Sequence, residues 1–367
     1  MAGKIMSMPR RHIFYLSTSL NIGGSETNLF RLVKHFMDEY DVTVAVLKEA
    51  GYFGGILAQN GIKVVHLPGI WAVASYLRKN SVDILHSFLY RANITGRIAG
   101  RIAGVPIIIS SRRAIDKWRN AWQVVLDRLS DGLANHIVCN SQASSKELVN
   151  EGYPQSRISV IYNGVDNAVF NMNESQDSAR NTLGLTPAEP IALIVARLHL
   201  EKGIDLLPAI ASKMPRGIFV VAGDGPLKKP FIDELKKLGL FSRFVFLGWR
   251  QDVASLMRAA DFMLMPSREE SFPQAGLEAA ACGIPIVGFD IGGMRELVED
   301  GQSGFLVSYM NIQAFADAAN IFAIDRARAR RMGALACSKA VQYSLKAMLT
   351  RTEELYKSLL LAHTQRK

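Results

Sequence analysis

Cysteine is scarce in this sequence, and its three copies, Cys139, Cys282 and Cys337, lie far apart. Their spacing fits neither a disulfide framework nor a zinc site, which favours a reducing compartment. No apolar run reaches the ~18 residues that a membrane span needs. The short apolar stretch after Arg10 and Arg11 runs straight into polar residues 21–26, so we interpret it as a first strand and not as a signal peptide.

Several nucleotide- and metal-binding motifs are missing as well. The sequence has no G-x-G-x-x-G dinucleotide fingerprint and no GxxxxGK[ST] P-loop. It also has no Asp-x-Asp motif, so we expect neither a metal ion nor a resident cofactor.

Charge is unevenly distributed along the 367 residues, whose formal net charge is +10. Residues 1–165 contain 19 Lys and Arg against 11 Asp and Glu, whereas the remainder has 24 against 22. A basic first half favours an anionic partner, which leaves nucleic acid, an acidic membrane and a phosphorylated ligand as alternatives.

Short apolar runs alternate with helical patterns along the whole chain. Most of the runs are continuous and not alternating, as in parallel strands buried on both faces. This βαβα rhythm predicts an α/β architecture with helices on both faces of each sheet. The predicted strands are 12–17, 42–47, 63–67, 82–87, 106–110, 136–140, 158–161, 191–196, 218–222, 244–247, 262–265, 285–289 and 304–307. Predicted helices include 26–37, 92–103, 118–129, 226–238 and 345–362.

The rhythm breaks once, at residues 167–181, which are polar and without periodicity. We place a linker there, between two Rossmann-like domains. The expected boundaries are 1–165, 166–344 and a final helix in 345–367. In open parallel sheets, ligands bind at the carboxyl ends of the strands.

The most informative motif is residues 266–283, PSREESFPQAGLEAAACG. A strand ends before it, and a helix is predicted to begin near Pro273. Amides of Gln274 and Ala275 at that helix start suit a phosphate, and Glu270 and Glu278 can accept hydrogen bonds from sugar hydroxyls. An ordinary solvated acidic helix cap is the alternative interpretation.

Two further stretches follow predicted strands. In residues 196–203, ARLHLEKG, Arg197 and Lys202 are cations that can neutralise a diphosphate. Each can equally be a strand cap or a solvated side chain. In residues 21–26, NIGGSE, the pair Gly23-Gly24 lets the backbone approach a ligand.

Together these residues resemble the GT-B glycosyltransferases of family 4, the retaining "glycosyltransferase group 1" enzymes. Each piece is weak evidence alone, but the set occurs in order over nearly the whole chain. The matching pieces are Gly23-Gly24-Ser25-Glu26, Asn163-Gly164-Val165-Asp166, Arg197 with Lys202-Gly203, Gly223-Asp224-Gly225-Pro226, Phe246-Leu247-Gly248, and Glu270 with Glu278.

The resemblance implies roles for these residues in a two-domain enzyme that moves a sugar from a nucleoside diphosphate donor. Glu278 would bind the ribose and Glu270 the donor sugar. Arg197 and Lys202 would hold the diphosphate, helped by the amides near Gln274 and Ala275.

Outside that cluster, the resemblance implies that Gly24 approaches the phosphate or the acceptor. The turn around Trp249 and Arg250 would meet the base. It also implies retention of anomeric configuration without a metal, and a final helix that crosses back onto the N-terminal domain.

The sequence departs from the family pattern in two places. Where many relatives have a histidine facing the donor sugar, this chain has Ser111-Arg112-Arg113. Either arginine can serve the acceptor or the phosphate, or neither faces the ligand; His86 is another candidate, or is simply packed. The glycines usually flanking the motif's phenylalanine are replaced by Ser271 and Pro273.

Residues 91–128 hold eight basic side chains and two acidic ones, with Trp118 and Trp122 on one predicted helix face. This composition suits an anionic membrane surface. A solvated basic face with both tryptophans in the core is the alternative.

We therefore expect a cytoplasmic glycosyltransferase, peripheral at the inner face of the membrane, with a UDP- or GDP-linked sugar as donor substrate. The expected acceptor is a glycan or lipid-linked precursor of cell-surface polysaccharide or lipopolysaccharide. A nucleotide-sugar epimerase or hydrolase on the same fold is the first alternative. A basic nucleic-acid-binding protein is the second; no nucleic-acid motif supports it, so no nucleic acid is expected.

Overall fold

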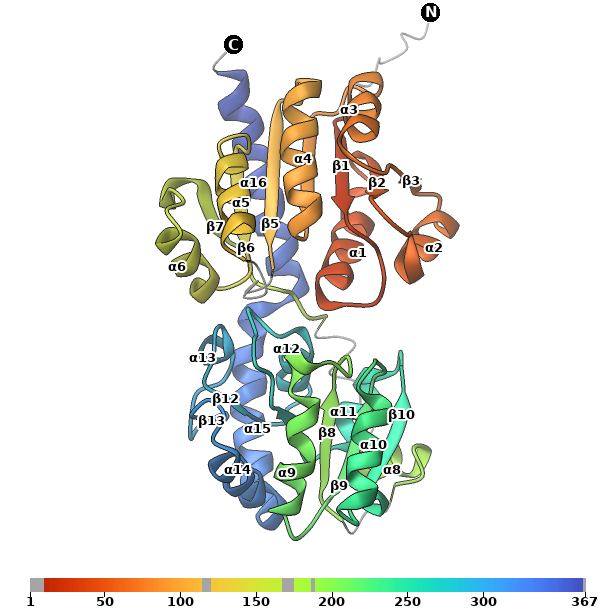
Figure 1. The fold of residues 1–367 in the computed structure, drawn as a ribbon, viewed down its shortest axis with the longest axis vertical. Coiled ribbons are helices and arrows are strands. Elements are labelled where there is room, and N and C mark those ends of the chain that lie inside the picture. The colour runs from red at the N-terminus through yellow and green to blue at the C-terminus, as the bar shows by residue number, and fades with distance from the viewer. Residues whose placement is uncertain (1–9, 114–119, 167–174, 186–188, 366–367) are drawn as a thin grey trace, which may run out of the picture. The chain divides into compact units, whose positions relative to one another are not determined.

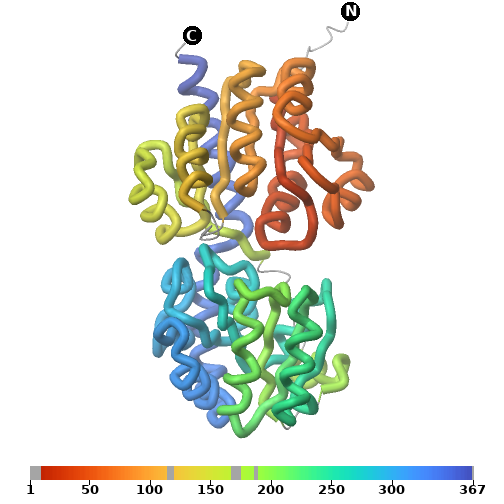
Figure 2. The backbone as a smooth tube through the Cα atoms, in the orientation of Figure 1, coloured from red at the N-terminus to blue at the C-terminus, as the bar shows by residue number. Residues whose placement is uncertain are grey.

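The computed structural model describes residues 10–113, 120–166, 175–185 and 189–365. The chain divides into two compact units, of which the first is Met1–Tyr162 with Leu349–Lys367 and the second is Asn163–Met348. The end of the chain, blue in Figure 2, lies among the elements of the first unit. Each unit contains one parallel sheet with helices packed around it (Figure 1).

The first unit contains a seven-stranded sheet in the order β3-β2-β1-β4-β5-β6-β7. Its strands are β1 His12–Ser17, β2 Asp41–Val46, β3 Lys63–His66, β4 Ile84–Phe88, β5 Ile107–Arg112, β6 His136–Cys139 and β7 Ile158–Val160. Its helices are α1 Gly24–Phe36, α2 Gly51–Gln59, α3 Ile70–Lys79, α4 Tyr90–Ala103, α5 Ala121–Asp131, α6 Gln142–Asn150 and most of α16 Leu345–Thr364.

The second unit contains a six-stranded sheet in the order β10-β9-β8-β11-β12-β13. Its strands are β8 Ile191–Val195, β9 Ile218–Ala222, β10 Phe244–Gly248, β11 Phe262–Met265, β12 Ile286–Phe289 and β13 Gly304–Val307. Its helices are α8 Gln176–Thr182, α9 Leu207–Ser212, α10 Lys228–Lys237, α11 Val253–Ala259, α12 Gln274–Ala281, α13 Met294–Leu297, α14 Ile312–Ile324 and α15 Arg326–Ala340.

Side chains of the first sheet alternate between two buried faces, as the pleat of a strand requires. On β1, Phe14 and Leu16 belong to a core cluster shared with α3 and α4. Tyr15 points the other way, where its hydroxyl accepts a hydrogen bond of 3.3 Å from Tyr356 of α16. The ring of Phe36 from α1 lies 5.2 Å from that of Tyr356. Helices therefore cover both faces, which explains why the strands read as continuous apolar runs.

The predicted α/β class with two Rossmann-like sheets is confirmed. Every predicted strand is present within the described residues, with ends that differ by no more than two residues. Parallel strands buried on both faces leave a strong signal, whereas ends depend on loop hydrogen bonds that composition does not reveal.

The prediction of an irregular linker at 167–181 is wrong for its last residues. Residues 167–174 lie outside the described part of the chain, but α8 begins at Gln176, capped by Ser175. The helix is anchored by Arg180, which is fully buried and donates a 2.7 Å hydrogen bond to Asp261. Because a charged side chain anchors it, α8 lacks the apolar periodicity that predicts helices.

Asp261 holds three segments of the second unit together. It accepts hydrogen bonds from Arg180, from Arg326 at 2.9 Å and from the backbone amide of Ile191 at 2.7 Å.

Because Asp261→Ala leaves Arg180 buried without its carboxylate, we expect the free energy of unfolding in urea to fall by about 3–5 kcal/mol. Asp233→Ala is the control. It removes an exposed ion pair with Lys229, and its effect should stay below about 0.5 kcal/mol. Equal effects of the two substitutions would contradict this account of α8.

Candidate active site

The candidate site lies at the carboxyl edge of the second sheet. Strands β8 and β11 are adjacent and parallel, so the segments that follow them, 196–203 and 266–273, leave the sheet at the same edge. Both motifs that sequence analysis singled out are in these segments.

Glycine at position 203 allows the two segments to touch. Gly203 has a φ of +64°, and a Cβ there would lie 1.9 Å from the carbonyl oxygen of Pro266. The amide of Arg268 donates to the carbonyl oxygen of Glu201 at 2.8 Å. Only glycine can adopt this φ with its backbone so close to the backbone of the second segment. Gly203 therefore keeps Lys202 within reach of the second segment.

A second contact, between Arg268 and the turn that follows the first segment, is an ion pair that sequence analysis missed. Both terminal nitrogens of Arg268 bond the carboxylate of Asp205 at 2.7 Å. These hydrogen bonds lower the pKa of Asp205 below its usual value. The two residues are 63 positions apart, and no local pattern links them.

Lys202 and Glu270 form the centre of the site. Lys202 Nζ lies 2.7 Å from Glu270 Oε1, which also accepts a 2.8 Å hydrogen bond from the hydroxyl of Ser267. The Glu270 side chain is 7% exposed and that of Lys202 is 25% exposed. The structure therefore brings together two of the three residues, Arg197, Lys202 and Glu270, that were expected to hold the diphosphate and the donor sugar.

Arg197, the third, follows β8 and presents its guanidinium to solvent. Its side chain is 63% exposed and lies 3.4 Å from a carboxylate oxygen of Glu201. At that exposure the pair contributes little to stability. Arg197 is therefore available to an anion at the same sheet edge.

Helix α12 carries the remaining candidate residues of the motif at 266–283, including Glu278, eight positions after Glu270. Gln274 and Glu278 are one turn apart, and Gln274 Nε2 donates to Glu278 Oε1 at 2.8 Å. Gln274 and Ala275 are the first two residues of α12, at the positive end of its dipole. The sequence suggested Pro273 as the first helical residue. In the structure Pro273 is the N-cap, and the helix begins one residue later, at Gln274.

The segment Asn163–Asp166 supports this motif from the start of the second unit. Asn163 Nδ2 donates to the carbonyl oxygen of Phe272 at 2.8 Å. Val165 exchanges backbone hydrogen bonds with Tyr343 and Leu345. In this structure the segment Asn163–Asp166 thus holds the loop that contains Glu270.

The turn Gly223-Asp224-Gly225 packs against the segment that carries Arg197. Gly223 has a φ of +143°, and a Cβ there would lie 1.9 Å from the carbonyl oxygen of Ala196. The amide of Leu198 donates to the backbone carbonyl oxygen of Asp224 at 2.9 Å. The turn therefore fixes the backbone on either side of Arg197.

Arg250 follows β10, and its Nε donates to Asp252 at 2.7 Å. That hydrogen bond raises the pKa of the Arg250 guanidinium. Neighbouring Trp249 is 43% exposed. A partly exposed indole beside a cation is suitable for stacking on a nucleobase.

In the first unit, Gly24 and His86 differ in accessibility. Gly24 is the first residue of α1 and is exposed at the carboxyl end of β1. His86 is buried, with its ring nitrogens hydrogen-bonded to Tyr356 at 2.6 Å and Ser111 at 2.8 Å. Burial lowers the pKa of His86 well below its usual value, so the ring is neutral and packed. Of the two alternatives that the sequence left open for His86, the structure shows the packed one.

Arg112 and Arg113 are also buried. Arg112 makes a bidentate ion pair with Glu151 at 2.6 and 2.8 Å. Arg113 lies over the ring of Phe88, and burial lowers its pKa to about 10. In this structure both arginines serve the interior of the first unit.

Within the part of the chain that the structure describes, no group of three or more His, Cys, Asp or Glu side chains could hold a metal ion. Among the same residues, no helix is both long and apolar enough to cross a bilayer.

Both halves of the chain match known glycosyltransferase families. Residues 22–169 match the family described as Glycosyltransferase Family 4, and residues 175–337 match Glycosyl transferases group 1. These two ranges correspond to the two sheets of the structure.

Curated relatives are 28% identical to this chain. One is the UDP-Gal:alpha-D-GlcNAc-diphosphoundecaprenol alpha-1,3-galactosyltransferase of Escherichia coli, with 77% of this chain and 79% of the relative covered. Another is the D-inositol 3-phosphate glycosyltransferase of Mycobacterium tuberculosis, of whose length this chain covers 59%.

Solved structures agree with the fold. The crystal structure of Anabaena HepE in complex with UDP-glucose has a TM-score of 0.86 at 26% identity, over 95% of this chain and 99% of that one. The sucrose-phosphate synthase of Thermosynechococcus elongatus has a TM-score of 0.83 at 19% identity, over 96% and 100%.

Three observations lead to one assignment. The chain has two parallel Rossmann-like sheets, each half of the chain matches a family model, and its structural neighbours are GT-B glycosyltransferases. The chain belongs to the group 1, family 4 glycosyltransferases and is a glycosyltransferase of the GT-B fold.

Proposed function

We propose that this glycosyltransferase moves a hexose from a UDP-linked donor to a lipid-linked or glycan acceptor. The reaction would take place at the inner face of the cell membrane, in the synthesis of a cell-surface polysaccharide. We further propose that it retains the anomeric configuration and requires no metal or resident cofactor. The observation that carries the proposal is the pairing of Lys202 with Glu270 at the carboxyl edge of the second sheet, with the exposed Arg197 following β8 at the same edge.

The choice of donor is supported by the relatives. The HepE structure contains UDP-glucose, and the Escherichia coli relative is named for UDP-galactose. That enzyme is also named for a diphosphoundecaprenol acceptor, which supports a lipid-linked acceptor here.

Lys202 would exchange its partner when the donor binds. Without donor, its ammonium group neutralises the buried carboxylate of Glu270. A diphosphate carries more negative charge than one carboxylate and would attract the ammonium group, helped by exposed Arg197. Negative charge grows on the diphosphate as the glycosidic bond breaks, so fixed cations stabilise the transition state more than the ground state.

Glu270 would then accept hydrogen bonds from the sugar. Ser267 continues to hold one of its oxygens, so the carboxylate stays in place when Lys202 leaves it. On α12, Glu278 would accept from the ribose hydroxyls and the first-turn amides would face a phosphate. Trp249 and Arg250 would meet the base.

Donor binding is tested by thermal stabilisation with a panel of UDP-, GDP- and ADP-linked sugars. A bound ligand raises the melting temperature, so UDP-sugars should shift it and ADP-sugars should not. With donor alone, free sugar or epimer should form far more slowly than product does with an acceptor. Rapid acceptor-independent release or epimerisation would instead favour a hydrolase or epimerase.

The role of Lys202 predicts a large loss of activity in Lys202→Ala. Turnover, measured as UDP release in the presence of acceptor, should fall by about 10²-fold or more, since one preorganised charge is lost. The fold should persist because Ser267 still bonds Glu270.

The matched control is Lys229→Ala. Lys229 is also paired with a carboxylate, that of Asp233, but its side chain is 88% exposed. Its removal should leave turnover within about twofold. If Lys202→Ala retains comparable activity, Lys202 does not hold the diphosphate.

A further inference from the structure

Helix α5 in the first unit is turned with its polar side chains inward and its apolar side chains outward. Asp127, Ser130 and Asp131 are 4–5% exposed. On the opposite side Trp122, Val125, Leu126 and Leu129 are 62%, 54%, 38% and 75% exposed. Helices in soluble proteins usually have the reverse arrangement. The alternative that placed Trp122 in the core is thus wrong, and Trp118 lies outside the described residues.

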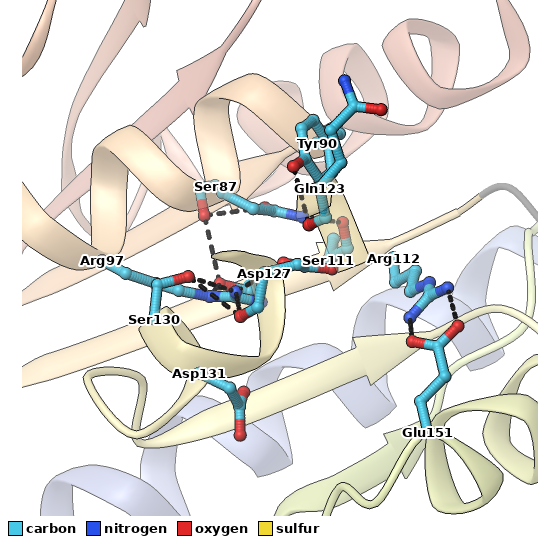
Figure 3. A network of polar contacts seen from close by, with 12 residues as sticks. Ser87, Tyr90, Arg97, Ser111, Arg112, Gln123, Asp127, Ser130, Asp131 and Glu151 are labelled. Atoms are coloured by element: carbon cyan, nitrogen blue, oxygen red, sulfur yellow. Dashed lines mark hydrogen bonds and ion pairs between the residues drawn. The ribbon is translucent and has the colours of Figure 1, made fainter. Parts of the chain in front are cut away.

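A buried ion pair fixes this orientation. Arg97 of α4 bonds Asp127 Oδ1 at 2.7 Å, with side chains only 3% and 6% exposed (Figure 3). The same nitrogen also donates to the Asp127 carbonyl oxygen at 2.9 Å and to Ser130 Oγ at 3.1 Å. Rotating α5 to bury its apolar side would leave Arg97 unpaired in the interior, which is strongly unfavourable.

Both ends of the helix are also fastened. Asn120 and Gln123 form a capping box at its start, and the hydroxyl of Tyr90 donates to the Gln123 carbonyl oxygen at 2.9 Å (Figure 3). At its end, Asp131 pairs with Arg157 at 2.8 Å. The outward apolar side is thus held by contacts along the whole length of α5.

The exposed apolar residues form one stripe. Trp122, Val125, Leu126 and Leu129 occupy positions i, i+3, i+4 and i+7, which share one side of a helix. The stripe, defined by these four residues, is contiguous and includes a tryptophan, which distinguishes it from a single exposed leucine.

The exposed charged side chains of the two helices that carry and adjoin the stripe are of one sign. Helices α4 and α5 lie wholly within the described residues, and their exposed charged side chains, Arg91, Arg101 and Arg128, are all basic. Arg101 reaches the carbonyl oxygen of Leu133 just beyond α5 at 2.7 Å. The acidic residues of these helices, Asp127 and Asp131, are buried and paired. An apolar stripe with a tryptophan and a basic border is complementary to an anionic lipid surface.

We propose that the stripe on α5 docks the first unit onto an anionic lipid bilayer, with the helix lying along the interface. The choice of a lipid partner rests on the proposed function, since a lipid-linked acceptor is reached from such a surface. A second copy of this chain fits less well, because two basic borders would face each other.

Co-sedimentation of the full chain with lipid vesicles tests the proposal. Binding to phosphatidylcholine vesicles with about one quarter phosphatidylglycerol should exceed binding to pure phosphatidylcholine at least about tenfold. It should weaken as salt rises from about 0.1 to about 0.5 M. The double variant Val125→Gln/Leu129→Gln should lose at least about tenfold in affinity for the anionic vesicles.

The matched control is Ile324→Gln/Leu335→Gln in the second unit, whose side chains are 72% and 53% exposed. It should bind like the unmodified chain. Equal binding by both double variants overturns the proposal, as does equal binding to neutral and anionic vesicles. A dimer of the unmodified chain that Val125→Gln/Leu129→Gln dissociates would assign the stripe to a second copy and also overturn it.

The proposed function fails separately from this inference. UDP-sugar stabilisation is measured without lipid and should be the same for Val125→Gln/Leu129→Gln and the unmodified chain. If the chain binds vesicles but no UDP-sugar raises its melting temperature, the proposed UDP-linked donor is contradicted, whereas the proposed docking of the stripe on lipid is still supported.

Discussion

The parallel pairing of β8 with β11 is the constraint on which the candidate site depends. Because both strands end at one edge of the sheet, Lys202 and Glu270 meet at 2.7 Å although 68 positions separate them. The contact between the two loops also requires glycine at 203, where the backbone of one loop approaches that of the other. The chemistry that we propose follows from this meeting of two loops.

The Lys202–Glu270 pair explains how a buried carboxylate can be kept ready without a ligand. An isolated buried charge is costly, and the ammonium group removes most of that cost. In the mechanism that we propose, a diphosphate would take the ammonium group, and the carboxylate would then need another donor, for which sugar hydroxyls are suitable. One ion pair would thereby couple recognition of the phosphate with recognition of the sugar.

Much of this architecture is visible in the sequence, for a physical reason. Strands buried on both faces, as here, leave continuous apolar runs, and the residues around Glu270 and Lys202 follow such runs directly. Helix α8 was missed because its anchor is the charged Arg180 and not an apolar stripe. Local pattern cannot reveal that kind of anchor.

Other features depend on partners distant in sequence. His86 is engaged by Tyr356, 270 positions away, and Arg268 by Asp205, so neither role could be predicted locally. For α5, the sequence pattern predicts a helix over 118–129, and the structure shows a helix from Ala121 to Asp131. The pattern does not indicate that the Arg97–Asp127 pair is buried and leaves the apolar stripe exposed.

The most direct test is a crystal structure of the full chain soaked with UDP-glucose. The account predicts that Lys202 Nζ has left Glu270 for an oxygen of the diphosphate, with Glu278 on the ribose. A diphosphate bound elsewhere, with Lys202 still on Glu270, would contradict it.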